Sequence, residues 1–459
     1  MKSDVAIVAA LITALMSMTV VMSTRIFAVA STPSPFKFVT GTDYYAPNDT
    51  AMPQKGITFS DPNFHTSIVR MTDKVDGYSS NGIENEYARI DPENSDGSYI
   101  ILRGNDGEYY LYDAFTFRMK KHLAGIMLGE EPEPRWDESN PKTFFYVYGT
   151  ELRNYNIDTD ASTTVHDFKQ EFPSAAYITT KVEGDASLDR RFWSFMVEDS
   201  SYNPISVIVF DKTSDSIVGQ KSVFPDSLNW VSMDMSGKQC IIGYDTHVAQ
   251  VFSRDLSAGL DLPRGANGHM DLALTSEGKD VMVYQNTATD WISMADLNTG
   301  VETNLAFIPF NVTEDMGLHF SGNCADTPGW VLVSTYGSKN PPPNENHSWM
   351  DTQLFMVELK ANPSIWRIAH THSYTSLNFT EEKNYFAEAF ASINTRGSRI
   401  YFGSNWGNFN SDHTDTYQVT LPQQWFATVP EFPSVLIALP FMLATLVTAI
   451  VYSRKHFEN

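Results

Sequence analysis

The sequence predicts an all-β protein, a seven-bladed β-propeller, on three observations. Strand-like apolar runs recur at a spacing of roughly 40–50 residues, the range of propeller blades. Nearly every such run follows a turn containing Gly, Asp, Asn or Ser, residues that tolerate the backbone conformations of hairpins. Long helical periodicity is absent from the body of the chain, which argues against α/β folds. About seven copies of the pattern therefore predict seven blades.

The clearest copy of the repeat spans residues 269–300. A polar-studded strand at 269–274 leads through a Ser-Glu-Gly turn to a strongly apolar strand at 281–285. A third strand at 291–297 ends on an Asn-Thr-Gly turn. Three strands of this kind cannot bury their faces alone, so the unit requires neighbours like itself.

The same three strands are expected in every unit. The middle, most apolar strand is predicted at 98–103, 143–148, 192–197, 239–244, 281–285, 330–336 and 399–404. The third strand is predicted at 109–115, 152–157, 206–211, 249–256, 291–297, 353–359 and 416–421. The first strand lines the channel of a propeller and is predicted at 84–90, 133–137, 181–185, 230–234, 268–274, 317–321 and 388–392.

The ring is predicted to close with strands from both ends of the propeller. Residues 67–72 precede the first full unit and resemble the late outer strand at 364–369. We expect them to form the outermost strand of the last blade, which removes the open sheet edge. The propeller is thereby predicted at 61–424, behind a leader or linker at 31–60. The long loop at 337–349 is an insertion within one blade.

Both ends of the chain carry apolar runs outside the propeller. Residues 1–30 predict a secretory signal peptide cut near Ala30, with an uncleaved N-terminal anchor as the alternative. Residues 435–452 predict a transmembrane helix, and the basic tail at 453–459 is expected in the cytoplasm. These segments predict a membrane-anchored cell-surface protein with its bulk outside the cell.

The net charge limits the partners. It is −23 at pH 7, so the basic footprint of a nucleic-acid-binding protein is missing. The partners we expect are a glycan or a cell-envelope protein, together with the membrane through the C-terminal helix.

Polar residues on the predicted first strands converge at the channel although they are distant in sequence. They are Glu84, Glu86, Arg89, Arg135, Asp185, Asp234, His269, Asp271, His319 and Glu388. For each of them, an ion pair that holds blades together is the alternative to a functional role.

Four histidines predict a divalent metal site. His269, His319, His370 and His372 all fall in the later units, and imidazoles that meet at a channel mouth suit Mn or Zn. His370 and His372 are spaced to share one face of a strand. Because they directly follow an outer strand, a loop position stays open for this pair. The acidic turn at 158–160 is a weaker candidate for Ca.

The segment ahead of the C-terminal helix resembles a sorting signal. The linker at 425–434 contains the letters VPEFP (429–433), similar to the PEF-type signals of archaeal surface proteins. The resemblance implies processing by an archaeosortase-like enzyme, with the helix replaced by a lipid anchor. Without such processing the helix stays.

Three stretches carry a resemblance to a known group of propellers. They are GHMDLA (268–273), AHTHS (369–373) and RIYFGSNW (399–406). They look like the secreted propellers related to TolB and WD40-like repeats and, more narrowly, like the seven-bladed lyases that act on oligogalacturonate or ulvan. In such lyases His, Tyr and Arg side chains gather at the channel, sometimes with a metal held by His.

The resemblance implies polysaccharide cleavage by β-elimination. His269 or His319 would be the base, and Arg89 or Arg135 would hold the uronate carboxylate. Binding of a glycan or envelope partner without catalysis is the leading expectation, and the lyase is its alternative. A hydrolase with paired channel carboxylates remains open.

Overall fold

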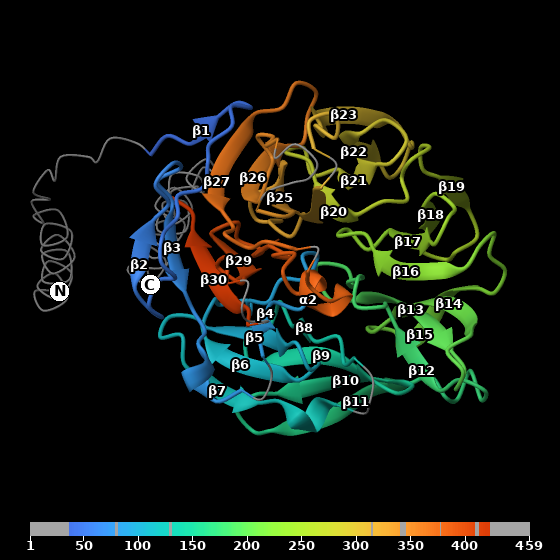
Figure 1. Ribbon diagram of the computed structural model, residues 1–459. Coiled ribbons are helices and arrows are strands. Elements are labelled where there is room, and N and C mark those ends of the chain that lie inside the picture. The colour runs from blue at the N-terminus through green and yellow to red at the C-terminus, as the bar shows by residue number, and fades with distance from the viewer. Residues whose placement is uncertain are drawn as a thin grey trace, which may run out of the picture. The chain divides into compact units, whose positions relative to one another are not determined.

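The computed structural model describes residues 36–422 apart from 79–80, 128–130, 314, 340–345, 377 and 409–412. Within these residues the chain forms seven antiparallel sheets of four or five strands, arranged as the blades of a propeller (Figure 1). The predicted fold class is confirmed. The predicted signal peptide, C-terminal linker, transmembrane helix and tail lie outside the described residues. No helix in the described part of the chain is long and apolar enough to cross a bilayer.

The second and third strands of each blade lie where the sequence predicts them. The second strands are β5 (Tyr99–Gly104), β9 (Thr143–Tyr148), β13 (Phe192–Glu198), β17 (Gln239–Tyr244), β21 (Asp280–Asn286), β25 (Trp330–Tyr336) and β29 (Arg399–Ser404). The third strands are β6 (Tyr109–Asp113), β10 (Glu151–Asn156), β14 (Pro204–Asp211), β18 (Gln250–Ser253), β22 (Trp291–Asp296), β26 (Gln353–Glu358) and β30 (Asp415–Thr420).

The innermost strands are β4 (Ile83–Glu84), β8 (Arg135–Trp136), β12 (Tyr177–Thr179), β16 (Leu228–Met233), β20 (Met270–Leu274), β24 (Gly317–Ser321) and β28 (Ser392–Ile393). The strand β24 spans the predicted residues, and the bounds of β16 and β20 lie within two residues of the predicted ones, whereas β4 and β8 are shorter than predicted. The strand predicted at 181–185 is wrong, because Lys181 and Val182 adopt positive φ angles and turn the chain after β12. The strand predicted at 388–392 begins only at Ser392, because Ala389 and Phe390 also adopt positive φ angles.

Strands from the start of the chain close the ring. Six outer strands follow their blades directly: β7 (Met119–His122), β11 (Ala161–Asp167), β15 (Ser216–Lys221), β19 (Gly259–Asp261), β23 (Glu302–Phe307) and β27 (Ile365–His370). The seventh is β3 (Ser67–Arg70), which pairs with β30 from Ser67↔Thr420 to Arg70↔Tyr417, as predicted. Within the segment assigned to the leader, β2 (Thr58–Ser60) extends this blade and β1 (Val39–Thr40) extends the sixth.

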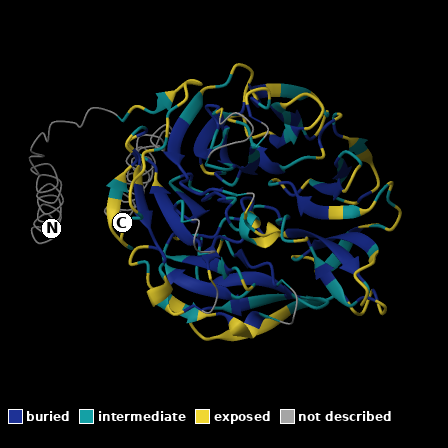
Figure 2. Ribbon diagram, in the orientation of Figure 1, coloured by how far each residue is buried: buried dark blue, intermediate teal, exposed yellow. Residues whose placement is uncertain are grey.

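The hydrophobic core is divided among the gaps between blades. Each gap holds one apolar cluster from the facing strands; the gap that closes the ring contains Val69, Ile100, Tyr112 and Tyr401. Figure 2 shows the inner strands in the buried colour and exposed residues mainly at the rim. A buried Val, Ile or Phe side chain stabilises the fold by about 1.5–3 kcal/mol, so every interface contributes to holding the ring together.

The helices within the described residues are short. Two 3-10 turns, η1 (Lys74–Asp76) and η2 (Ala124–Ile126), lie on connections in the early blades. The helix α2 (Glu381–Tyr385) begins at Thr380, whose hydroxyl accepts a hydrogen bond from the Lys383 amide. It belongs to the connection between the sixth and seventh blades and lies at the centre of the ring in Figure 1. This connection delivers Glu388 to the channel.

Candidate functional site

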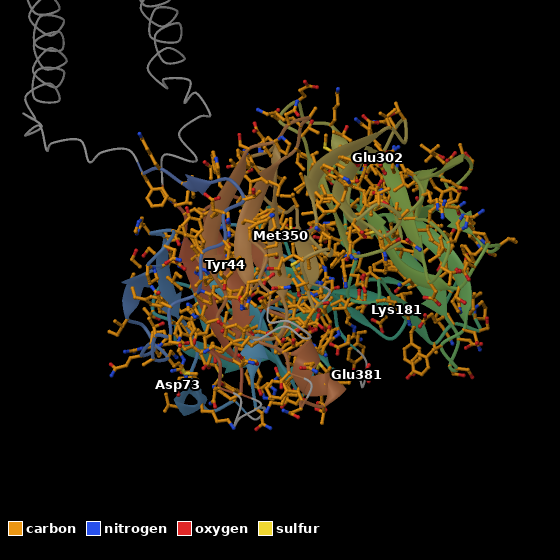
Figure 3. The ribbon with its side chains drawn as sticks, turned by 45° about the horizontal axis from the view of Figure 1, so that its top comes forward. Tyr44, Asp73, Lys181, Glu302, Met350 and Glu381 are labelled. Atoms are coloured by element: carbon orange, nitrogen blue, oxygen red, sulfur yellow. The ribbon has the colours of Figure 1, made fainter. Side chains whose placement is uncertain are left out.

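Five side chains from four blades form the candidate site, which we call the mouth cluster: Arg89, His269, His319, Tyr336 and Glu388. Arg89 follows β4 in the first blade, and His269 immediately precedes β20 in the fifth. His319 lies in β24 and Tyr336 ends β25, both in the sixth blade, whereas Glu388 precedes β28 in the seventh. In Figure 3, Glu381 marks the start of the helix that leads to Glu388.

His319 is at the centre of the cluster. Its side chain is almost fully buried, and its Nε2 lies 2.9 Å from Glu388 Oε2. The His269 ring lies edge-on to it at 4.6 Å between centroids, and the Tyr336 ring stacks on it at 5.2 Å. The two histidines that the sequence placed at the starts of inner strands are therefore brought together by neighbouring blades.

Both imidazoles are held neutral. Burial lowers the pKa of His269 to about 3, assisted by the positive charge of Arg89. Burial, followed by the charge of Arg89, likewise lowers the pKa of His319 to about 3. At neutral pH neither ring carries a proton on both nitrogens, so each acts as a hydrogen-bonding group of low basicity.

Glu388 is the group whose pKa suits proton transfer. Burial raises the pKa of its carboxyl to about 7, and a hydrogen bond from the Tyr336 hydroxyl opposes part of that rise. Its side chain is 17% exposed, so it keeps contact with the channel mouth. The sequence had named Glu388 as a channel residue without giving it a role.

Tyr336 is a member of the cluster that sequence reasoning missed. It pairs with Gly317 across β24 and β25, and a Cβ on Gly317 would lie 2.2 Å from the tyrosine ring. The glycine thus makes the space in which the ring lies against His319. Burial and the charge of Glu388 raise the pKa of Tyr336, which keeps its hydroxyl protonated. A glycine opposite an aromatic residue was the available signal.

Arg89 extends from the first blade to side chains of the third and fourth blades. Its guanidinium is paired with Glu183 at 2.9 Å and lies 4.8 Å from the Trp230 ring. It also lines a cavity of about 40 Å³ on the axis, to which all seven blades contribute residues. Asp271 lines the same cavity, and its carboxylate accepts hydrogen bonds from the Gly322 and Leu272 amides at 2.7 and 2.8 Å.

Arg135, the other predicted carboxylate partner, is engaged within the protein. Its side chain is 3% exposed and lies 2.7 Å from the Glu86 carboxylate, itself 4% exposed. It also donates to the backbone carbonyls of Pro134 and Gly184 at 3.0 and 2.9 Å. The Tyr109 hydroxyl donates to Glu86 from the other side at 2.6 Å. This arrangement gives Arg135 a role in joining the second and third blades.

His370 and His372 lie away from the mouth cluster. Cross-strand pairing sets His319 level with Ser334, Leu354 and Ala369, so three strand spacings, roughly 14 Å, separate His319 from the end of β27. There His370 contacts the Tyr45 carbonyl at 2.9 Å and stacks on Phe64. His370 ends β27, whereas His372 lies in the loop that follows and packs on Trp406. The loop position that the sequence left open is therefore observed for His372.

The donor set does not fit the predicted metal. Within the described residues there is no group of three or more His, Cys, Asp or Glu side chains placed to hold a metal ion. His319 and Glu388 supply two donors, and these face each other in a hydrogen bond. Mn and Zn sites need at least three protein ligands or equivalent oxygen donors.

The buried carboxyls predict a pH-dependent stability. Burial raises the pKa of Glu86, Asp271 and Glu388 to about 7. Between pH 6.5 and 8.5 the folded protein therefore still holds protons that the unfolded chain has already lost, and stability falls as these protons leave. Buried histidines have the opposite effect, but only below about pH 6.5, the ordinary pKa of histidine.

We expect the free energy of unfolding to fall by roughly 2–4 kcal/mol between pH 6.5 and 8.5. Urea denaturation across this range measures the effect, and Glu388→Gln should make the fall shallower. A stability that stays level or rises over the same interval would contradict the assigned protonation states.

The comparisons with known proteins concern the fold. No protein-family model matches this chain, and no curated protein matches it. Among solved structures, an oligogalacturonate lyase in complex with manganese is 14% identical with a TM-score of 0.55, covering 81% of this chain and 97% of its own. An oligogalacturonate lyase from Vibrio parahaemolyticus is also 14% identical with a TM-score of 0.55, covering 80% and 97%. The predicted resemblance to the oligogalacturonate lyase propellers is confirmed at the level of the fold.

Proposed function

We propose that the mouth cluster cleaves a uronic-acid polymer by β-elimination. The observation that carries this proposal is the pairing of a carboxyl of pKa about 7, Glu388, with the neutral imidazole of His319 at 2.9 Å. A general base is most effective when its pKa lies near the working pH. Glu388 meets that condition, whereas the two histidines, with pKa values of about 3, do not.

The reaction requires three roles. Glu388 takes the proton from the carbon next to the uronate carboxylate, and Arg89 offsets the negative charge that develops on that carboxylate. The bond to the leaving oxygen breaks as the ring gains a double bond, and the Tyr336 hydroxyl supplies the proton to that oxygen. His319 positions Glu388 by its hydrogen bond, and His269 packs against His319.

The similarity in fold supports this assignment, but it does not identify equivalent residues. Both solved structures are oligogalacturonate lyases, and one of them is a manganese complex. Our proposal assigns the base to a carboxylate and the charge stabilisation to an arginine.

The test is an assay of the purified propeller against polymers of galacturonate, glucuronate, guluronate and mannuronate. Elimination creates an unsaturated end that absorbs ultraviolet light, so the expected result is a rising trace with at least one polymer. Chelation of divalent metals should leave the rate unchanged. A trace that stays flat over the whole panel, with folded protein, would exclude the lyase.

A second candidate function is the binding of a glycan or an envelope protein without cleavage. It is favoured by the size of the axial cavity, about 40 Å³, which is little more than the space of one water in the liquid. Arg89 is also already paired with Glu183 there. Binding on a glycan array together with a flat lyase trace would favour this function.

We also propose that the protein acts at the cell surface, held by its C-terminal segment. The support is the sequence of residues 1–30 and 425–459, with apolar runs and a basic end. Protease treatment of intact cells is the measurement. A propeller that stays protected until the cells are broken would contradict the proposal.

A further inference from the structure

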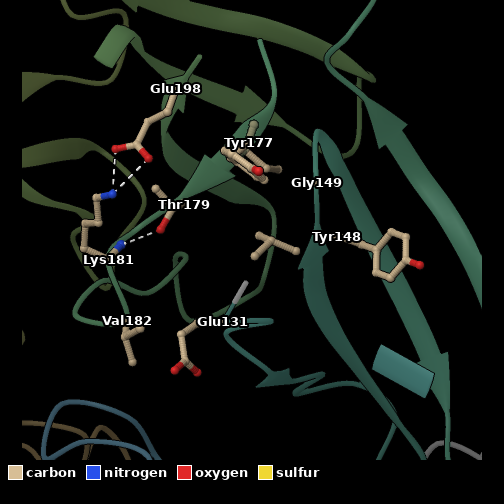
Figure 4. A pocket seen from close by; sticks show the side chains of 10 residues that line it. Glu131, Tyr148, Gly149, Tyr177, Thr179, Lys181, Val182 and Glu198 are labelled. Carbon is tan, nitrogen blue, oxygen red and sulfur yellow. Dashed lines mark hydrogen bonds and ion pairs between the residues drawn. The ribbon is translucent and has the colours of Figure 1, made fainter. Parts of the chain in front are cut away.

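A second cavity lies off the axis, between the second and third blades. Its volume is about 160 Å³, which is the space of roughly five waters in the liquid. Its lining includes Tyr177 in β12, with Glu131, Lys181 and Glu198 supplying charge, whereas the ring of Tyr148 at the end of β9 points away from Tyr177 (Figure 4). The cavity therefore combines one aromatic side chain with convergent polar groups, a composition found in small-molecule sites.

The charges in this cavity are already paired. Lys181 Nζ lies 2.7 Å from the Glu198 carboxylate, which is 2% exposed. Glu131 is paired with Arg103 and accepts a hydrogen bond from the Tyr109 hydroxyl at 2.9 Å. An ionic ligand would find no uncompensated partner, whereas a neutral ligand rich in hydroxyl groups would find acceptors and a donor around it.

An aromatic platform supports one wall. The Tyr202 ring stacks on Tyr177 at 5.2 Å between centroids, with the planes 5° apart. Tyr177 is the member of the pair that lines the cavity. The stacking restricts the motion of the Tyr177 ring, and the flat apolar face of a sugar ring can pack on such a restricted aromatic surface at low cost in side-chain entropy.

The floor of the cavity is a strained turn. Glu133, Lys181 and Val182 all have positive φ, at 49°, 59° and 67°, which is unfavourable for residues with side chains and most of all for a β-branched valine. The buried Glu133 carboxylate holds the turn by accepting from the Thr180 amide at 2.9 Å and the Val182 amide at 3.2 Å. Strain of this kind persists at sites that need a particular shape.

We infer that this cavity binds a single neutral sugar residue. The next residue of the turn, Glu183, pairs with Arg89 in the axial channel, so the site lies beside the mouth cluster but has its own walls. The inference goes beyond the proposed function and does not depend on cleavage, because binding here uses none of the groups assigned to elimination.

The experiment measures the binding of methyl glucoside, methyl galactoside and methyl mannoside to the Glu388→Gln variant by saturation-transfer NMR and titration. At least one neutral glycoside should bind, and galacturonate should bind at least tenfold more weakly. Tyr177→Ala should weaken that binding at least tenfold, whereas Tyr177→Phe should stay within twofold because it keeps the ring.

Phe307→Ala removes a half-exposed aromatic residue in the fifth blade and serves as the matched control, with binding unchanged. Tyr177→Leu tests the same wall should Tyr177→Ala fail to fold, because it also removes the aromatic ring. The inference is overturned by the absence of binding to all three neutral glycosides at tens of millimolar, by equal binding of galacturonate, or by full binding in a folded wall variant. A lyase that is inactive but still binds a neutral glycoside would leave this inference standing.

Discussion

Replacing Arg135 with methionine is expected to lower the free energy of unfolding by about 3–5 kcal/mol. The guanidinium is the cation next to the buried Glu86 carboxylate and also satisfies the Gly184 and Pro134 carbonyls. Its removal leaves a carboxyl group and two carbonyl oxygens buried with fewer partners, each of which costs free energy. Urea denaturation at pH 7 measures the loss.

Two further variants make this prediction specific. Arg135→Met combined with Glu86→Gln should recover much of the lost stability, because no unpaired charge then remains in the interior. Lys279→Met breaks the exposed pair with Glu277, at side-chain exposures of 59% and 70%, and should change stability by less than about 0.5 kcal/mol. If Arg135→Met costs no more than this control, the buried pair does not join the blades as described.

Replacing Glu388 with glutamine is expected to slow elimination by roughly 10²–10⁴-fold. Glutamine preserves the size of the side chain and a hydrogen bond to His319 or Tyr336 but cannot accept the proton of the substrate. The affinity for the polymer should change little, so the loss should appear in kcat with KM nearly constant.

Glu382→Gln is the matched control for this variant. Glu382 is an exposed residue of the nearby helix α2, and its substitution should leave the rate unaltered. Near-normal elimination by Glu388→Gln would move the base to another residue, and His269 and His319 would be tested next because the sequence predicted one of these two as the base.

The second and third strands could be predicted because their signals are local. An apolar run such as β21 follows a glycine-containing turn and needs no knowledge of its neighbours. The closing strand β3 could also be predicted, since its sequence resembles that of a late outer strand and a closed ring requires an outer strand for its last blade. Among the inner strands, β12 and β28 could not be predicted, because positive φ angles at Lys181, Val182 and Phe390 interrupt the segments where strands were expected.

The residues of the candidate site also separate into those that local sequence signals could place and those that depend on contacts distant in sequence. His269 and His319 could be placed together because each belongs to the inner strand region of neighbouring blades. The pKa of Glu388 depends on burial by a connection that carries no strand pattern, so its role was hidden. His370 and His372 were spaced like residues of one strand, but β27 lies three strands out from the inner strand β24 of its blade, and spacing alone does not give distance from the axis.

The pairing of β3 with β30 also means that the seventh blade can be completed only after nearly the whole propeller has been synthesised. Arg70 and its partner Asp415 are 345 residues apart, and at about 5–20 residues per second a ribosome needs roughly 20–70 s to make the intervening polypeptide. Throughout that interval the nascent β3 can pair only with β2, and the edge that later receives β30 exposes backbone groups that favour aggregation. Prematurely terminated chains lack β30 altogether, so quality control can distinguish them from finished molecules by an unsealed seventh blade.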